Sequence, residues 1–271
     1  MTQPAERLAE RYRQPADQPP GWNATIDALL AHRSVRAYLP DALAPGTVEL
    51  LVAAAQSAAS SSNLQPWSVV AVEDPARKAR LAALAGHQTH LEQAPLLLIW
   101  LVDLNRLDTI GQQRGEPTEA LAYLETFLLG AVDTALAAQN AVVAAESLGL
   151  GTVYVGAIRN RPVEVAAELA LAPQVFALFG LAVGHPDPAR PAAVKPRLPQ
   201  AAVLSREAYG NPQAPAAIAA YDAHLEAFQR EQGLPPRGWS AQATQRVGGP
   251  EAMAGRDRLR EALATLGFAL R

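Results

Sequence analysis

The chain has 271 residues, a hydrophobic content of 49% and a formal net charge of −3, which is enough to fold as one large domain or two smaller ones around a buried core. This slightly acidic balance argues against a nucleic acid or a membrane surface as partner. The chain contains no cysteine, and this excludes disulfides, thiolate catalysis and metal sites with cysteine ligands.

The first residues lack the basic and then apolar pattern of a signal peptide. No apolar run approaches the ~20 residues needed to span a bilayer, so we expect a soluble, cytoplasmic protein. Residues 5–13 predict a short helix, and the proline-rich residues 14–21 predict an irregular connection. We therefore expect an N-terminal arm over residues 1–22, followed by a single domain over residues 23–271.

The rest of the chain alternates between helical and strand patterns. The predicted helices begin at Asn23 and Pro45 and then cover residues 75–85, 118–148, 162–169, 213–231 and 250–266. The predicted strands cover residues 67–72, 96–102, 152–155 and 176–184. These elements indicate an α/β or α+β sheet with both faces covered. The helix over residues 118–148 is apolar nearly all round and belongs in the core or in a subunit interface, and residues 213–271 form a helical excursion of the same domain.

Two short segments concentrate positive charge in this net-acidic chain. The first is His32-Arg33-Ser34-Val35-Arg36, and the second is Lys195-Pro196-Arg197-Leu198-Pro199. Arginine binds phosphate oxygens in pairs, serine adds a directional donor, and the prolines fix an extended backbone that projects Lys195 and Arg197 to one side. The alternative for the first segment is a solvated helix end, with cations near the negative pole of the dipole. If the two segments converge, they suit one phosphate-bearing ligand.

Other chemistries find little support in the sequence. The chain has no Gly-x-Ser-x-Gly, no Gly-x-Gly-x-x-Gly and no Walker loop, which disfavours a serine hydrolase, an ordinary dinucleotide-binding fold and an ATPase. His87 and His90 have no carboxylate at metal-binding spacing. We interpret them as surface residues and expect no metal site.

Several motifs, each weak alone, occur in one specific order. They are the His32–Arg36 segment, the Ser60-Ser61-Ser62 loop, Gly86-His87-Gln88, the helix from Gly130 to Gly149, the strand Gly151-Thr152-Val153-Tyr154-Val155-Gly156 and the Lys195–Pro199 segment. In this order they resemble the nitroreductase family, in its NADPH-dependent branch of oxygen-insensitive nitroreductases and flavin oxidoreductases. The resemblance covers about residues 24–268, and residues 1–22 exceed the family pattern.

The resemblance implies an α+β, nitroreductase-like fold, with an antiparallel-dominated central sheet flanked by helices. It implies an intertwined homodimer with FMN at its interface. The implied activity is hydride transfer from NADPH or NADH, by way of flavin N5, to nitroaromatics, quinones, azo compounds or free flavin in alternating half-reactions. Because the cofactor carries the chemistry, no side chain is expected to act as acid or base.

The resemblance also implies which residues hold the flavin. The ribityl phosphate is assigned to His32, Arg33, Ser34, Arg36, Lys195 and Arg197. Ser60, Ser61 and Ser62 reach the flavin from the other subunit, and Gln88 bonds its pyrimidine edge. Tyr154, Val155, Gly156 and Ala157 line the ring, with the Gly156 N–H donating to N5.

Some positions depart from the family pattern. Ala157 and Asn63 stand where relatives often have glycine and a bulky apolar residue. Gln232 stands where close relatives have an arginine that binds the NADPH 2′-phosphate, so Arg230 or Arg237 is a candidate substitute. Arg256 matches an arginine near the substrate entrance, against the alternative of a solvated helix residue.

Three alternatives to a general oxidoreductase stay open at this point. The first is a dedicated NAD(P)H-flavin reductase that supplies reduced FMN to a partner. The second, motivated by Gln232, is a flavin store or sensor with little turnover. The third is a ligand-free helical interaction protein, which the ordered set of motifs disfavours.

Overall fold

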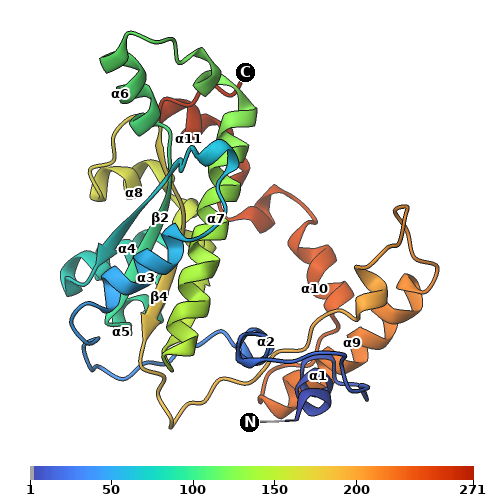
Figure 1. The fold of residues 1–271 in the computed structure, drawn as a ribbon. Helices are drawn as coiled ribbons and strands as arrows, with labels where there is room; N and C mark the ends of the chain where they lie inside the picture. The colour runs from blue at the N-terminus through green and yellow to red at the C-terminus, as the bar shows by residue number, and fades with distance from the viewer. Residues whose placement is uncertain (1–2) are drawn as a thin grey trace. The chain divides into compact units, whose positions relative to one another are not determined.

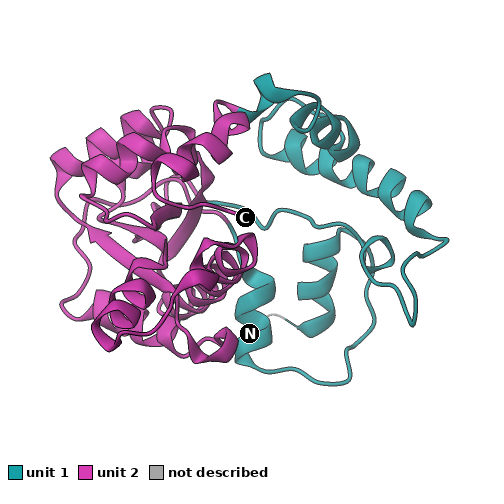
Figure 2. Ribbon diagram, turned by 90° about the horizontal axis from the view of Figure 1, so that it is seen from above, with its two compact units in different colours: residues 1–33, 192–253 teal, residues 34–191, 254–271 magenta. Residues whose placement is uncertain are grey.

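The computed structural model describes residues 3–271, and the chain divides into two compact units. Unit 1 comprises residues 1–33 and 192–253, and unit 2 comprises residues 34–191 and 254–271 (Figure 2). The boundaries between these units differ from the predicted division into an arm over residues 1–22 and a single domain over residues 23–271. The predicted domain boundaries stay a prediction.

Unit 2 is built on one four-stranded antiparallel sheet (Figure 1). Its strands are β1 (Trp67–Val72), β2 (Leu96–Asp103), β3 (Gly151–Val155) and β4 (Val175–Gly184), in the spatial order β1-β2-β4-β3. Every neighbouring pair is antiparallel. The predicted α+β class with an antiparallel central sheet is thus confirmed, and the α/β alternative is wrong.

Helices cover both faces of this sheet. On one face, α3 (Thr47–Gln56) and α7 (Leu124–Ser147) enclose a core that includes Leu98, Trp100 and Leu181. The small alanines of α7 let that helix lie close to the strands. On the other face lie α4 (Pro75–Leu84), α8 (Pro162–Glu168) and the 3₁₀ turn η3 (Gly156–Asn160). All eight residues of β2 are buried, as its continuous apolar run predicted.

The long helix differs from its prediction in extent. Instead of one helix over residues 118–148, the structure has a 3₁₀ turn, η2 (Glu119–Ala122), and then α7. Tyr123 between them is extended, at φ −95° and ψ 149°. The neighbouring main chain pairs with the last residue instead, because the Leu124 N–H donates to Arg271 O and the Arg271 N–H donates to Ala122 O. This tertiary contact accompanies the break at Tyr123, and the long helix begins only at Leu124.

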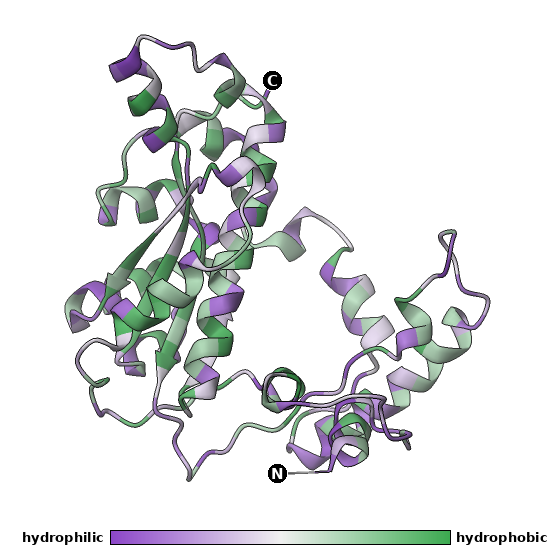
Figure 3. Cartoon of the chain, in the orientation of Figure 1, coloured by the Kyte–Doolittle hydropathy of each residue, from purple (hydrophilic) through white to green (hydrophobic). Residues whose placement is uncertain are grey.

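By length and composition, α7 is apolar enough to cross a membrane, which corrects the prediction that no apolar stretch approaches that length. Figure 3 shows hydrophobic residues along this helix. The helix nevertheless packs against the sheet through its alanines, and it carries the buried carboxylate of Asp133. Core helices of soluble proteins can have the same length and apolar composition.

The C-terminal part is also more broken than predicted. Residues 250–266 form two 3₁₀ turns, η5 (Pro250–Met253) and η6 (Arg256–Arg258), and the short helix α11 (Leu259–Thr265). Ala254 and Gly255 between the turns both have positive φ, which an α-helix cannot include. The sequence prediction also missed α5 (Thr89–Gln93) and α6 (Asn105–Arg114).

Unit 1 contains the helices α1 (Pro4–Tyr12), α2 (Ala24–Ala31), α9 (Ala214–Glu231) and α10 (Trp239–Arg246), with the 3₁₀ turn η4 (Gln200–Ala202). Helix α10 occupies chain that was predicted to be outside any helix. Tyr221, Leu225 and Phe228 of α9 form the core with Leu198 and Trp239. The arm helix α1 is joined to α2 by an ion pair between Arg7 and Asp27 (3.2 Å).

Candidate cofactor-binding site

The first basic segment begins at the end of α2, in unit 1. Helix α2 ends at Ala31, and His32 is its C-cap, with φ −49° and ψ 135°. Arg33 follows and is exposed. The helix-end interpretation therefore holds for His32, while the chain has already left the helix at Arg33.

The remainder of this segment lies in unit 2, against the edge of β3. Ser34 forms a parallel bridge with Thr152, and the Val35 N–H donates to Thr152 O at 2.9 Å. Val35 is buried beneath this edge, and Arg36 is exposed. A Cβ at Gly151 would lie 2.8 Å from the Val35 side chain, so glycine is needed at that position for the close approach.

The second basic segment is extended and lies within unit 1. Burial alternates along it: Val194 and Pro196 are buried, whereas Lys195 and Arg197 are exposed. This alternation agrees with the prediction that Lys195 and Arg197 project to one side. The Tyr221 hydroxyl donates to Pro196 O at 2.8 Å and fixes the main chain between them.

Within unit 1 the two basic segments converge on one side chain, Arg11 of the arm helix. Arg11 Nη1 donates to Lys195 O at 2.8 Å, and Arg11 Nη2 donates to His32 O at 2.6 Å. One guanidinium therefore holds the main chains of both segments. The sequence could only suggest that these segments meet, and it gave Arg11 no role.

The serine loop in unit 2 is held by hydrogen bonds to Asp133 of α7. The Ser60 hydroxyl donates to Asp133 Oδ2 at 2.6 Å, and the Ser61 N–H lies 3.3 Å from Oδ1. Ser61 and Ser62 are exposed. Ser62 and two further residues of the loop have positive φ without being glycine, which is the kind of strain that often accompanies functional loops. Asp133 was missed by sequence reasoning, although a lone carboxylate within an apolar helix was a usable signal.

Gln88 follows a tight turn in which Gly86 and His87 both have positive φ. It is half-buried, and its Nε2 donates to Ala85 O at 3.0 Å. This bond orients the amide so that Oε1 serves as the acceptor.

The end of β3 carries the remaining predicted ring contacts. Tyr154 is 38% exposed, and its ring packs edge-on against Phe179 with centroids 5.1 Å apart. Burial raises the pKa of the Tyr154 hydroxyl, and Glu146 raises it further. Val155 is buried, and Gly156 and Ala157 open the turn η3.

Two guanidinium groups lie beside Gly156. A Cβ built at Gly156 would be 3.4 Å from Arg159 Nη2 and 3.8 Å from Arg256 Nη1. Burial lowers the pKa of Arg159, and the charge of Arg256 lowers it further. Arg256 is thus close to a predicted ring contact, which disfavours its interpretation as an ordinary solvated residue. Arg159 was missed, although it follows Gly156 by only three positions.

The candidate substitutes for the nucleotide-binding arginine lie in unit 1. Arg230 pairs with Glu226 at 3.0 Å, and Arg237 donates to Gln245 and to Ala241 O. Gln232 is the C-cap residue of α9. Both arginines are exposed and already engaged with neighbours, so the structure gives neither a distinctive position.

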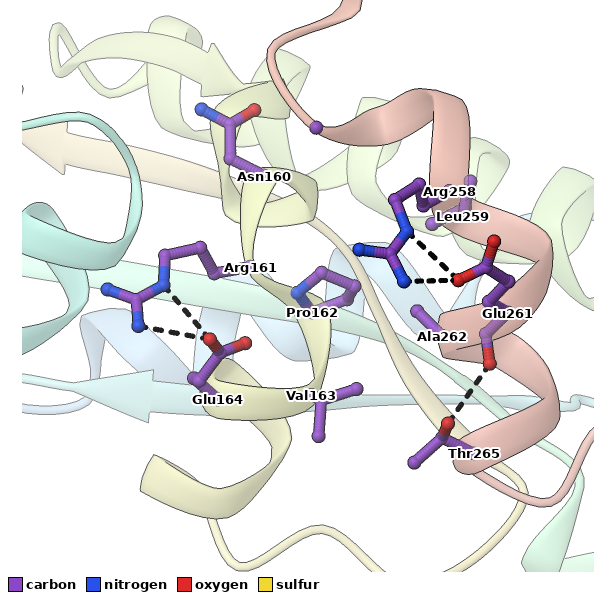
Figure 4. A pocket seen from close by; sticks show the side chains of 11 residues that line it. Asn160, Arg161, Pro162, Val163, Glu164, Arg258, Leu259, Glu261, Ala262 and Thr265 are labelled. Carbon is purple, nitrogen blue, oxygen red and sulfur yellow. Dashed lines mark hydrogen bonds and ion pairs between the residues drawn. The ribbon is translucent and has the colours of Figure 1, made fainter.

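A cavity of about 340 Å³ lies between η3, α8 and the C-terminal elements of unit 2 (Figure 4). Its charged groups are paired internally, Arg161 with Glu164 and Arg258 with Glu261. None of the residues predicted to hold the flavin lines it. Among residues 3–271, no group of three His, Asp or Glu side chains gathers as a metal site would require.

Sequence comparison finds two matching family descriptions. The "Nitroreductase family" matches residues 29–185, and the "Nitroreductase family, C-terminal domain" matches residues 195–271. The chain is 41% identical over 225 residues to an "FMN reductase [NAD(P)H]" of Bacillus subtilis, covering 80% of this chain and 88% of that protein. It is 39% identical over 209 residues to an "Oxygen-insensitive NADPH nitroreductase" of Salmonella typhimurium, covering 77% and 84%.

Comparison with solved structures also finds proteins with a similar fold. The structure of NfrA2 from B. megaterium has a TM-score of 0.86 and 38% identity, and the match covers 92% of this chain and all of that one. The NADPH:FMN oxidoreductase from Vibrio harveyi, solved with NAD+, has a TM-score of 0.81 and 34% identity over the same shares. The nitroreductase-like fold predicted from the motifs is confirmed, and the chain belongs to the nitroreductase family.

Proposed function

We propose that this protein is an FMN-dependent NAD(P)H oxidoreductase. Bound FMN supplies a ring that accepts hydride from NADPH or NADH and passes the electrons on to a second substrate. The observation that carries the proposal is the convergence of the two basic segments on Arg11 in unit 1, in a chain of the nitroreductase family.

The exposed residues Arg33, Lys195 and Arg197 suit the phosphate of FMN. They lie on segments whose main chains are tied together, and the protein as a whole is net acidic, so this is a local concentration of positive charge. Guanidinium and ammonium groups are the donors that a phosphate dianion prefers. His32 of unit 1 belongs to the same concentration of charge, because its main chain is bonded to Arg11. The family resemblance also assigns Ser34 and Arg36, which follow in unit 2, to the phosphate, and this assignment stays a prediction.

The flavin ring suits the end of β3 and the turn before α5. Gly156 has no side chain, so the main chain there is open to a flat ring, and Arg159 and Arg256 add positive charge beside it. Positive charge near a flavin favours its reduced, more anionic form. The Gln88 acceptor suits the N–H of the pyrimidine edge, and we propose that Tyr154, Val155 and Ala157 line the ring.

We propose that the protein is a homodimer. Helix α7 leaves a row of apolar side chains exposed at intervals of four residues: Leu124 at 54%, Leu128 at 55%, Val132 at 49% and Leu136 at 43%. Residues four apart lie on one helix face, and an apolar row of this length on an otherwise packed helix suits a protein interface. A second copy is the partner that the family favours, and Ser60, Ser61 and Ser62 would then serve its flavin.

Light scattering tests the dimer. Leu128→Glu places a charge in the middle of the exposed row and should yield monomers, whereas Ile110→Glu on α6, at a similarly exposed apolar position, should leave the mass unchanged. If Leu128→Glu remains dimeric, the exposed apolar row of α7 does not form the dimer interface.

The second substrate is a nitroaromatic, a quinone, an azo compound or free flavin, taken in the place that NAD(P)H leaves. Relatives bear names of both kinds, FMN reductase and nitroreductase, so a dedicated flavin reductase is the second candidate. Comparing turnover of free FMN with turnover of a nitroaromatic separates the two. Arg230 and Arg237 are engaged with neighbouring residues, so the preference between NADPH and NADH has to be measured. We propose a cytoplasmic location, where NADPH and NADH are both available.

The visible absorption spectrum tests the proposal as a whole. Purified protein should be yellow with about one FMN per chain, and anaerobic NADPH or NADH should bleach it. A coloured protein that neither nucleotide bleaches would indicate a flavin store or sensor. A colourless protein that takes up no FMN would contradict flavin binding altogether.

A further inference from the structure

Arg11 is a buried arginine in the arm helix, and its contacts lie entirely within unit 1. Its side chain is 4% exposed, which is rare for arginine because taking the charge out of water is costly. The guanidinium is satisfied by main-chain carbonyls: Nε and Nη2 donate to Leu30 O at 3.2 and 2.7 Å, Nη2 also to His32 O at 2.6 Å, and Nη1 to Lys195 O at 2.8 Å.

These contacts connect the C-terminal end of α2 to the extended segment around Lys195. Helix α2 has no basic residue in its last turn, so Arg11 supplies the cation that favours the negative end of its dipole. The connection is reciprocal, since the Arg197 N–H donates to Arg11 O at 3.1 Å. The main chains of His32, Lys195 and Arg197 are thus all bonded to one residue of the arm.

The surroundings of Arg11 favour a negative ligand nearby. Burial lowers the pKa of Arg11, and the charge of Arg197 lowers it further. Arg11 and Arg197 therefore repel each other across the contact that holds the segment in place. An anion bound by Arg197 would relieve this repulsion, so the cost of burying Arg11 falls when the site is filled.

We propose that Arg11 is a positioning residue for phosphate binding. It fixes the spacing between the segment of Arg33 and the segment of Lys195 and Arg197, so that their exposed side chains face one anion before it arrives. Holding binding groups in place beforehand lowers the ordering cost of association. This inference rests on the proposed function, in which these side chains bind the phosphate of FMN.

Riboflavin provides the matched ligand, because it has the same ring and ribityl chain without the phosphate. Flavin-free protein is titrated with FMN and with riboflavin, and the ratio of the two dissociation constants measures the phosphate contribution alone. In Arg11→Ala, FMN affinity should fall by about tenfold or more, while riboflavin affinity changes by less than about threefold. A merely structural defect would weaken both ligands alike.

Arg13→Ala is the control. Arg13 lies two residues further along the arm and carries the same charge, but it pairs with Glu231 at 2.8 Å and stacks over Phe228. Its loss should leave the FMN-to-riboflavin ratio unchanged. If Arg11→Ala does not fold by circular dichroism, the titrations are made on Arg11→Lys, which keeps the charge without the planar fork. A preference for FMN over riboflavin that is at least about threefold weaker than in wild type supports the inference.

The two proposals fail in different ways. A wild-type protein that binds FMN no better than riboflavin contradicts the phosphate site, and this inference with it. A wild-type protein that prefers FMN, with an Arg11 variant that keeps the full preference, overturns the positioning role alone. Equal losses for both ligands in the Arg11 variant also overturn it.

Discussion

The bond between Ser60 and Asp133 allows a quantitative test of how unit 2 holds its serine loop. Asp133 is buried, and it accepts from the Ser60 hydroxyl at 2.6 Å and from the Ser61 N–H at 3.3 Å. A hydrogen bond to a charged group contributes ~1.5–3 kcal/mol to stability. Ser60→Ala should therefore lower the free energy of unfolding by at least about that amount, because it also removes the bond that the Gln65 N–H donates to Ser60 Oγ at 2.9 Å. Asp133→Ala should likewise lose the shared bond together with the longer one from Ser61.

A double-mutant cycle isolates the shared bond. If both single variants lose the same hydrogen bond, the double variant loses it only once, so the coupling energy should be ~1.5–3 kcal/mol. Urea unfolding of the four proteins measures it, and melting temperatures should fall by about 3–12 °C in each single variant. Ser57→Ala is the control, since its hydroxyl bonds Ala53 O on an exposed helix end, and we expect a change within ~0.5 kcal/mol.

The outcome that would refute this reasoning is additivity. A coupling energy below about 0.5 kcal/mol would mean that the two residues act independently. If the coupling is present, Asp133→Asn should retain roughly half of it, because the amide oxygen still accepts from Ser60 without the charge.

Three further predictions follow from single contacts. Arg33→Ala and Arg197→Ala should each weaken FMN binding by ~10–150-fold while the protein stays folded, as flavin fluorescence titration and circular dichroism would report. Gly151→Ala, whose Cβ would lie 2.8 Å from a neighbouring side chain, should lose ~1–3 kcal/mol in urea unfolding, whereas Gly156→Ala, with its nearest contacts at 3.4 and 3.8 Å, should fold normally and bind FMN more weakly. His90 has a buried Nε2 without a hydrogen-bond partner in residues 3–271, and burial followed by the charge of Arg36 lowers its pKa. The unfolded chain therefore takes up the proton first, stability falls as the pH drops below about 6.5, and His90→Gln should reduce this loss in urea midpoints between pH 7.5 and 5.5.

Much of unit 2 could be predicted because its signals are local. The strand over residues 67–72 is found with the predicted bounds, and the fully apolar run of β2 is buried on both faces as expected. In unit 1, a local signal was equally informative: Asn23 caps α2 by accepting from the Ile26 N–H at 2.9 Å, which is the interaction that a residue of this type at a helix start provides. In these places, propensity, pattern and capping all agree.

The failures have a different physical origin. Tyr123 interrupts the long helix because residues 122 and 124 pair with Arg271 at the far end of the chain. Nothing near Tyr123 in the sequence encodes that contact. Helix α10 was missed for a similar reason. Its first residue, Trp239, packs against the apolar cluster on α9, and this tertiary contact outweighs the Gly- and Pro-rich sequence that precedes the helix.

The residues proposed to bind the phosphate were easier to find in the sequence than the residues that support them. Arg33, Lys195 and Arg197 stand out as exposed charges within motifs, whereas Arg11 and Asp133 were not recognised. Each of these two is a buried charge whose role depends on partners that are distant in the sequence. Asp133 lies within the motif from Gly130 to Gly149, but nothing in that motif singled it out.

Arg11 and Asp133 solve the same physical problem with opposite charges. A loop or extended segment that presents polar groups to a ligand cannot also bury an apolar side chain at every position, so its main chain needs another anchor. Arg11 anchors two segments by donating to their carbonyls, and Asp133 anchors the serine loop by accepting from a hydroxyl and an N–H. An isolated buried charge is too costly to be retained without such partners. A buried charged residue on a helix is therefore a sign that a polar segment of the chain is bonded to it.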